Sequence, residues 1–142
     1  MAALVLSRLS RLTGEKRWRE AADLQLSWLA GAAQDYPAGH SFAMLTFLEV
    51  LWPTAELVVT AQKTPEEFQI FLQGNSYWNL MVLLKTPENA DALAVLAPFT
   101  KNYPIPAQEA RYYLCQGGAC AQPVDSISEL EILLRSMSVP GS

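Results

Sequence analysis

Residues 56–60 read ELVVT, and the turn signal TPEE at 64–67 separates them from the apolar run NLMVLL at 79–84. The first run is short, apolar and β-branched, which is typical of a strand. The second is apolar along its whole length, as in strands that are buried on both faces of a parallel sheet. Between the two, Thr64 is placed to cap a helix and Glu67 to complete its capping box. The segment therefore predicts a strand, a helix and a second strand.

The same alternation continues toward the C-terminus. Thr86-Pro87-Glu88 repeats the cap signal and predicts a helix to about residue 96, and residues 110–115 (ARYYLC) predict a third strand. Ser126-Ile127-Ser128-Glu129 is a further capping box that opens a last amphipathic helix, and a loose tail is expected from Ser138. Strands that alternate with helices are joined by right-handed crossovers, so the order β-α-β-α-β-α predicts a small three-stranded parallel sheet.

Helices are predicted upstream of this unit. Residues 2–13 repeat apolar side chains at helical spacing, and Gly14 follows as a C-cap. A second helix, over about 15–33, places one stripe toward the core: Trp18, Ala22, Leu26, Leu29 and Ala33. A third, from about His40 to Leu51, is apolar nearly all round, which predicts burial on most sides before Trp52-Pro53 ends it. We therefore expect antiparallel helices over residues 1–53 and a small α/β subdomain over 54–142.

Composition and charge exclude several classes of protein. The chain has 142 residues and a net charge of −4, and its basic residues are scattered apart from Lys16, Arg17 and Arg19. Nucleic-acid binding needs a basic face, so we expect no nucleic-acid partner. No apolar run reaches the roughly 18 residues of a membrane span, and no signal peptide is recognisable at Met1–Leu6. These observations predict a cytoplasmic protein. Only 17% of residues are charged, against about a quarter in ordinary domains, so apolar surface is expected to contact another protein.

Cys115 and Cys120 form the one candidate site for chemistry. Four residues separate them, whereas a CxxC redox motif has two, and a zinc site needs four ligands when only His40 and carboxylates are at hand. Gly117-Gly118 lets the chain fold back, so a disulfide or half of a metal site is geometrically open. A packed strand-end cysteine and a cysteine that caps the turn explain the pair without chemistry. All these explanations stay open at this point, and Cys115 and Cys120 are the candidate redox pair.

The other titratable residues have structural explanations. His40, the only histidine, follows Gly39 at a helix start, where a capping or surface role fits better than a Cys-His dyad. Glu66, Glu67 and Glu88 stand at helix N-termini, where negative charge is favourable. Neither GxGxxG nor Walker A is present, so no nucleotide site is predicted. No complete catalytic constellation is found, and no cofactor or metal site is assigned. Trp18, Trp28, Trp52 and Trp78 are expected to be packing residues of the core.

The run Ala110-Arg111-Tyr112-Tyr113-Leu114-Cys115, followed by Ala119-Cys120-Ala121-Gln122-Pro123-Val124, resembles the C-terminal signature of YyaL-like proteins, the spermatogenesis-associated thioredoxin-domain family. Residues 9–14 and 18–22 resemble late helices of that family's α/α barrel. The similarity covers nearly the whole chain but only the last part of a full-length member. The resemblance implies a parent protein with an N-terminal thioredoxin-like domain and a central α/α toroid similar to sugar epimerases and glycosidases. The family's chemistry would centre on those parts.

The expected function follows from this resemblance. We expect a non-catalytic accessory or structural region of a larger thioredoxin-domain-containing protein, with the thioredoxin-like domain and the toroid of the parent as partners. One alternative is a redox-linked module in which Cys115 and Cys120 exchange electrons with the parent's thioredoxin-like domain. Another is a protein-interaction module, and we expect the chain to self-associate.

Overall fold

The computed structural model describes residues 1–52 and 54–137. The predicted helix end at about Leu51 is confirmed, whereas Pro53 and the predicted loose tail from Ser138 lie outside these residues. The chain divides into two compact units, residues 1–52 with 96–98, and residues 53–95 with 99–142, and each is described by itself. No helix within the described ranges is both long and apolar enough to cross a lipid bilayer.

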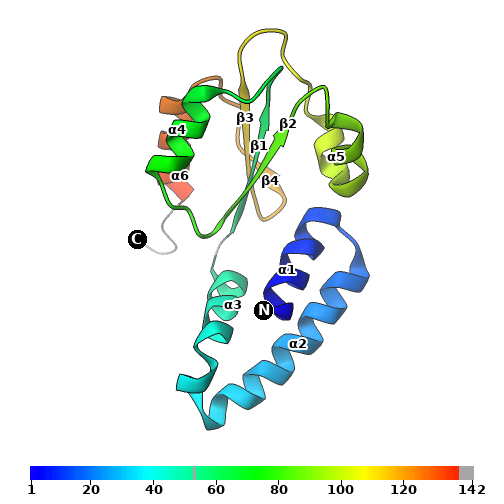
Figure 1. Cartoon of the computed structure of the whole chain (residues 1–142), viewed down its shortest axis with the longest axis vertical. Helices are drawn as coiled ribbons and strands as arrows, with labels where there is room; N and C mark the ends of the chain where they lie inside the picture. Colours follow the sequence, from blue (N-terminus) through cyan, green and yellow to red (C-terminus); the bar gives the residue numbers. More distant parts are fainter. Residues whose placement is uncertain (53, 138–142) are drawn as a thin grey trace. The chain divides into compact units, whose positions relative to one another are not determined.

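The first unit is helical. It contains α1 (Ala2–Thr13), α2 (Lys16–Asp35), the short 3₁₀ helix η1 (Pro37–His40) and α3 (Ser41–Leu51). Gly14 ends α1 in the left-handed conformation, at φ 70°, and its N–H donates to the carbonyl of Ser10. This tight link lets α1 and α2 run antiparallel and side by side (Figure 1). Of the stripe predicted for α2, Ala22 and Ala33 are buried, and Trp18, Leu26 and Leu29 are half-buried.

In α3, small and polar side chains are buried and large apolar side chains are exposed, which is the reverse of what is expected of an apolar helix. The residues it buries are Ala43, Thr46 and Glu49. Four large apolar side chains spaced three residues apart are exposed: Phe42, Leu45, Leu48 and Leu51. The prediction that this helix is buried on most of its sides is therefore wrong. The reason is that Glu49 faces α1, where Arg8 and Arg11 bind its carboxylate.

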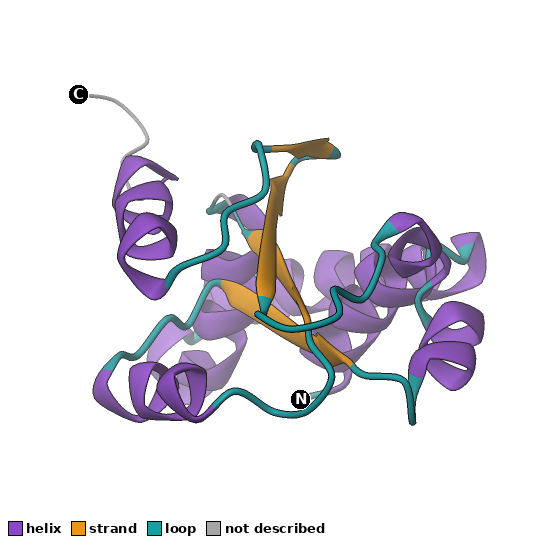
Figure 2. Ribbon diagram, turned by 90° about the horizontal axis from the view of Figure 1, so that it is seen from above, coloured by secondary structure: helices purple, strands orange, loops and turns teal. Residues whose placement is uncertain are grey.

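The second unit is α/β, as predicted. Its elements are β1 (Ala55–Thr60), α4 (Glu66–Gly74), β2 (Leu80–Lys85), α5 (Ala90–Leu96), the 3₁₀ helix η2 (Pro98–Asn102), β3 (Arg111–Gln116), β4 (Ala119–Cys120) and α6 (Ile127–Met137). The last residue of α5 and the first of η2 are assigned to the first unit. The sheet has four strands in the order β2-β1-β3-β4. β1 and β2 are parallel, whereas β3 is antiparallel to β1 and β4 is antiparallel to β3. The predicted three-stranded parallel sheet is therefore wrong in both strand number and direction (Figures 1 and 2).

The point at which the chain re-enters the sheet gives β3 its direction. A parallel third strand would require the chain to return along the sheet by a strand length, about 20 Å for six residues, before it enters. The connection runs through α5, which has seven residues. η2 and an extended, proline-containing segment follow it, and β3 starts with Arg111 opposite Thr60, the last residue of β1. The chain thus re-enters the sheet at the end where β1 and β2 finish.

One face of the sheet packs against α4 and α6, which lie side by side (Figure 1). The buried core there consists of Ala55, Leu57, Val59, Phe68, Phe71, Tyr112, Leu114, Leu130 and Leu134. The alternation of side chains along β1 and β3 sends Glu56, Val58, Tyr113 and Cys115 to the opposite face. That opposite face carries the candidate site.

The helix caps agree only in part with the predicted ones. The Ser126–Glu129 capping box of α6 is confirmed, because Ser126 Oγ accepts from the Glu129 N–H at 3.3 Å. Thr64 does not cap α4, since Pro65 occupies the N-cap position and no side chain caps the helix. Before α5, the side chain of Asn89 binds the preceding turn and not the helix: its Oδ1 accepts from the Thr86 N–H at 2.8 Å, and its Nδ2 donates to the carbonyl of Leu84.

Candidate functional site at the Cys115–Cys120 hairpin

Cys115 and Cys120 are joined by a disulfide across the hairpin of β3 and β4. Gly117 and Gly118 have φ values of 58° and 83°, the positive pair typical of a two-residue type I′ turn. This turn pairs Cys115 directly with Cys120, with their Cα atoms 3.9 Å apart. Of the alternatives that the sequence leaves open, the structure therefore contains the disulfide. In the described part of the chain, no three His, Cys, Asp or Glu side chains gather closely enough to hold a metal ion.

The two cysteines differ in exposure. Cys115 is in a central position of the sheet and is 7% exposed. Cys120 is in the short edge strand β4 and is exposed to solvent. A soluble thiol therefore meets the Cys120 side of the bond first.

Tyr103 completes the site. Its hydroxyl lies 3.3 Å from Cys115 Sγ and 3.2 Å from Cys120 Sγ. Its ring packs on that of Tyr113, with the centroids 4.4 Å apart. A phenol oxygen is thus held within hydrogen-bonding distance of both sulfurs.

A buried lysine fixes the backbone that carries Tyr103. Lys85, the last residue of β2, is only 7% exposed, and its Nζ donates to the carbonyls of Thr100 and Tyr103 at 2.7 and 2.8 Å. Burial of an ammonium is costly unless its donors are used, and here two carbonyls accept from it. Lys85 therefore holds η2 and the backbone of Tyr103 against the end of β2. The position of the Tyr103 hydroxyl depends on this anchored backbone.

The surroundings of Tyr103 keep its hydroxyl protonated. Burial raises the pKa of Tyr103 above its ordinary value, and the proximity of Tyr113 and the negative charge of Glu56 raise it further. Glu56 pairs with Cys115 in the register of β1 and β3, so its carboxyl belongs to the same face of the sheet. At neutral pH the phenol is a hydrogen-bond donor to the disulfide.

The chain beyond β4 is anchored back onto β3. Tyr112 and Val124 exchange backbone hydrogen bonds of 2.8 and 3.1 Å. Next to them, Arg111 binds both carboxylate oxygens of Asp125, with its Nε 2.6 Å from Oδ1. This ion pair lowers the pKa of Asp125, chiefly through the hydrogen bond from Arg111. The hairpin that carries the disulfide is therefore held at its open end as well as at its turn.

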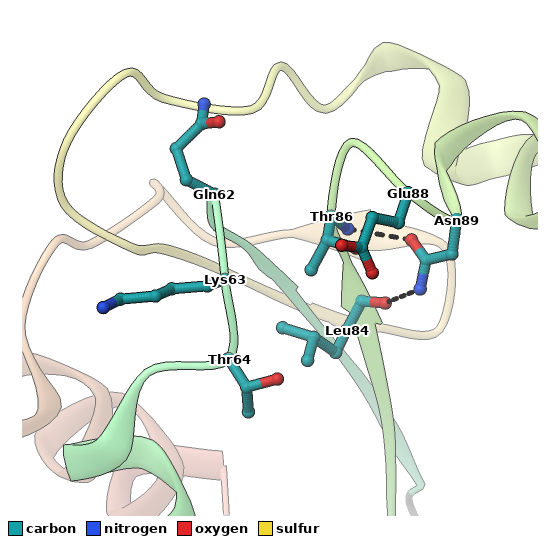
Figure 3. A pocket seen from close by; sticks show the side chains of 7 residues that line it. All are labelled: Gln62, Lys63, Thr64, Leu84, Thr86, Glu88 and Asn89. Atoms are coloured by element: carbon teal, nitrogen blue, oxygen red, sulfur yellow. Dashed lines mark hydrogen bonds between the residues drawn. The ribbon is translucent and has the colours of Figure 1, made fainter.

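A separate hollow of about 330 Å³ lies where β1 and β2 end. Its lining residues are Gln62, Lys63, Thr64, Leu84, Thr86, Glu88 and Asn89 (Figure 3). The amide of Asn89 binds the backbone of Thr86 and Leu84, and the side chain of Lys63 extends away from the loop that bears Glu88. A carboxylate thus borders the space while the nearby cation points elsewhere, which disfavours an anionic ligand such as a phosphate.

The remaining predicted residues lie elsewhere. His40 ends η1 in the helical unit and is half-buried, and both cysteine sulfurs are bonded to each other. Trp18 is half-buried beneath the guanidinium of Arg17, which lies 4.4 Å from its ring centroid. Trp28, Trp52 and Trp78 are exposed, so the prediction that they belong to the core is wrong.

Sequence reasoning missed Tyr103 and Lys85. Tyr103 is 12 and 17 residues away from the two cysteines, and only the return of the chain through η2 brings them together. The signal for Lys85 was its position at the end of an apolar strand, where a charged residue needs partners.

No family model, no curated protein and no solved structure matches this chain.

Proposed function

We propose that this chain is a non-catalytic accessory region of a larger thioredoxin-domain-containing protein, and that α3 docks it onto that protein. The resemblance of residues 110–124 and 9–22 to the YyaL-like, spermatogenesis-associated thioredoxin-domain family supports this assignment. On this proposal α1, α2 and α3 are the last helices of the parent's α/α toroid. The second unit is a small α/β subdomain attached to them.

The exposed stripe of α3 carries the proposal. Phe42, Leu45, Leu48 and Leu51 are between 44% and 81% exposed, and at a spacing of three residues they wind around about half of the helix surface. A surface helix normally turns such a stripe toward the core and its polar residues toward water. α3 does the reverse, burying Thr46 and Glu49. A contiguous apolar face of this kind is typical of a protein–protein contact.

The ion pairs of Glu49 keep the stripe facing outward. Arg8 donates to both oxygens of Glu49, at 2.7 and 2.9 Å for the two closest contacts, and Arg11 adds a third partner atom at 3.2 Å. The side chain of Glu49 is 5% exposed, so its charge depends on these partners. If α3 rotated to bury its leucines, the ion pairs of Glu49 with Arg8 and Arg11 would break, and the carboxylate would turn to the exposed side of the helix. Covering the stripe with an apolar partner costs less free energy than breaking these ion pairs.

Self-association of the isolated chain tests this proposal. In the absence of other partners, the stripes of two copies should cover each other, so light scattering should show a mass that rises with protein concentration. Leu48→Glu places a charge in the stripe and should hold the chain monomeric. Ile132→Glu is the matched control, because Ile132 is equally apolar and 68% exposed but belongs to α6. A monomer at every concentration, or equal loss of association in both variants, would contradict the proposal.

A second candidate is the redox-linked module, in which the Cys115–Cys120 disulfide exchanges electrons with the parent's thioredoxin-like domain. The observation that favours it is the disulfide itself, with Cys120 exposed. In the cytoplasm, where the sequence predicts that the protein resides, disulfides are mostly transient and serve catalysis or redox sensing. Counting free thiols by mass spectrometry, with and without reductant, tests it. A bond that resists reduction in the folded chain would reject this candidate.

A further inference from the structure

We propose that Cys115, Cys120 and Tyr103 form a thiol–disulfide exchange site for a dithiol partner, entered at Cys120 and assisted by the hydroxyl of Tyr103. The inference rests on the redox candidate above and adds to it the order of bond exchange, the assisting residue and the chemical class of the partner.

The difference in exposure selects the sulfur that is attacked. Exchange begins when a thiolate attacks one sulfur of the disulfide, and access decides which one. Cys120 is exposed in the edge strand β4, whereas Cys115 is 7% exposed between β1 and β4. The incoming thiolate therefore bonds to Cys120 Sγ, and Cys115 Sγ leaves.

Tyr103 stabilises the leaving sulfur. A disulfide sulfur is a weak acceptor, but a thiolate carries a full charge, and hydrogen bonds to charged groups are about twice as strong as neutral ones. The Tyr103 hydroxyl already lies 3.3 Å from Cys115 Sγ, so its bond strengthens as the charge develops without any rearrangement. The raised pKa of Tyr103 keeps the proton on the phenol during this step.

Glu56 is the charged residue that pairs with Cys115 in the β1–β3 register, and a negative charge on the same face of the sheet disfavours a thiolate. Tyr113, the other titratable neighbour on β3, packs on Tyr103 through its ring. Among these groups, Tyr103 is the one whose hydroxyl is in hydrogen-bonding range of the sulfur that leaves.

A thiolate of the partner forms a bond to Cys120 Sγ, the Sγ–Sγ bond breaks, and its electron pair passes to Cys115 Sγ. Cys115 leaves as a thiolate, which takes a proton from solvent once the exchange is complete. The partner's second thiolate then attacks its own sulfur in the mixed disulfide and releases Cys120, which is protonated in turn. Two electrons have moved: the Cys115–Cys120 disulfide is reduced to two thiols, and the partner dithiol is oxidised to a disulfide.

The hairpin explains why a dithiol is needed. Cys115 and Cys120 remain paired across β3 and β4 after the bond breaks, because the Gly117-Gly118 turn and the Ala121 N–H to Leu114 carbonyl bond, 2.9 Å long, do not depend on it. The freed Cys115 thiolate is thus poised to expel a single thiol from Cys120 at high effective concentration. Only a partner with a second thiol competes intramolecularly and completes the reduction.

The reduction kinetics of the full chain test the proposal. Dithiothreitol is the dithiol probe and glutathione the monothiol probe, and released thiols are counted by alkylation and mass spectrometry. At equal thiol concentration, dithiothreitol should reduce the bond fully while glutathione leaves most of it closed.

Tyr103→Phe keeps the ring on Tyr113 but removes the hydroxyl, and it should slow reduction by roughly tenfold. It should also raise the apparent pKa for alkylation of Cys115 in the reduced chain. Tyr77→Phe, a hydroxyl deletion on the α4 side of the sheet, is the matched control and should change neither.

These outcomes test the redox candidate and the role of Tyr103 separately. If dithiothreitol does not reduce the folded chain, the redox candidate itself fails. If it does, but Tyr103→Phe reacts at the wild-type rate with an unchanged pH profile, the role of Tyr103 is wrong. Should Tyr103→Phe fail to fold, acid quenching of the wild-type reaction with glutathione still decides the order of exchange. The trapped mixed disulfide should map to Cys120, and a glutathione adduct on Cys115 would overturn the proposal.

Discussion

At the scale of single residues, charges that are taken out of water fix the positions of the more exposed groups around them. Lys85 holds η2 through two backbone carbonyls, and Glu49 holds α3 through Arg8 and Arg11. In both cases one buried charge decides where less buried side chains point. Tyr103 depends on the first of these anchors, and the stripe of α3 depends on the second.

Neutralising Glu49 should destabilise the helical unit. Breaking a buried ion pair costs several kcal/mol, but Arg8 is 52% exposed and its share is screened by water, so we expect Glu49→Gln to cost about 2 kcal/mol. Urea unfolding followed by the helical circular dichroism signal measures it. Glu20→Gln breaks the exposed Lys16–Glu20 pair and should cost less than about 0.5 kcal/mol. Equal costs for the two variants would mean that Glu49 does not orient α3.

The Arg111–Asp125 pair should make stability depend on pH. The pKa of Asp125 is lowered in the folded chain, mainly by the hydrogen bond from Arg111. A carboxyl with a depressed folded pKa stabilises the fold above its unfolded pKa of about 3.9, and this contribution is lost as the pH falls through the folded value. Carboxyl ¹³C shifts should therefore give Asp125 a midpoint below the ordinary one, and Arg111→Met should move the midpoint upward. If Arg111→Met left the titration midpoint of Asp125 unchanged, the ion pair would be contradicted.

At the scale of elements, the β3–β4 hairpin shows what a local turn determines. Gly118 adopts a positive φ of 83°, and a Cβ added there would meet nothing within 4 Å. Gly118→Ala should therefore cost about 1 kcal/mol through backbone strain alone. Gly31 lies within α2, also with open space around it, so Gly31→Ala should stabilise the fold by roughly 0.5–1 kcal/mol. Denaturant unfolding of both variants measures the change in the free energy of unfolding. A decrease in stability for both variants would contradict this explanation.

Local signals predicted some helix ends correctly, failed at the α4 cap, and did not predict the strand direction. Gly14 and the Ser126–Glu129 box were recognisable because each cap acts within a few residues. The Gly117-Gly118 pair was a hairpin signal as well, but β4 has only two residues and escaped recognition as a strand. The direction of β3 depends on how far α5 and η2 carry the chain, which no residue pattern encodes.

The candidate site was predictable only as a pair of cysteines. Their spacing and the glycines between them showed that a disulfide could form, but not that it does. Tyr103 joins the site through the anchoring of η2 by Lys85, a contact between residues 18 positions apart. The outward stripe of α3 was equally hidden, because an apolar helix with one glutamate reads as a buried helix until the partners of Glu49 are known.

At the scale of the whole molecule, the chain consists of two units with different features. The helical unit exposes apolar side chains on α3, and the α/β unit holds a disulfide between two strands of its sheet. The low share of charged residues, 17%, fits a chain with a surface to be covered. The central claim is therefore that α3 is a docking helix.

Amide hydrogen exchange of the full chain at low and high protein concentration tests that claim most directly, because it locates the contact as well as detecting it. As concentration rises and copies associate, we expect slower exchange for the amides of Ser41–Leu51, with the α6 amides unchanged. Association with unchanged exchange in α3, or protection that appears only in another element, would contradict it.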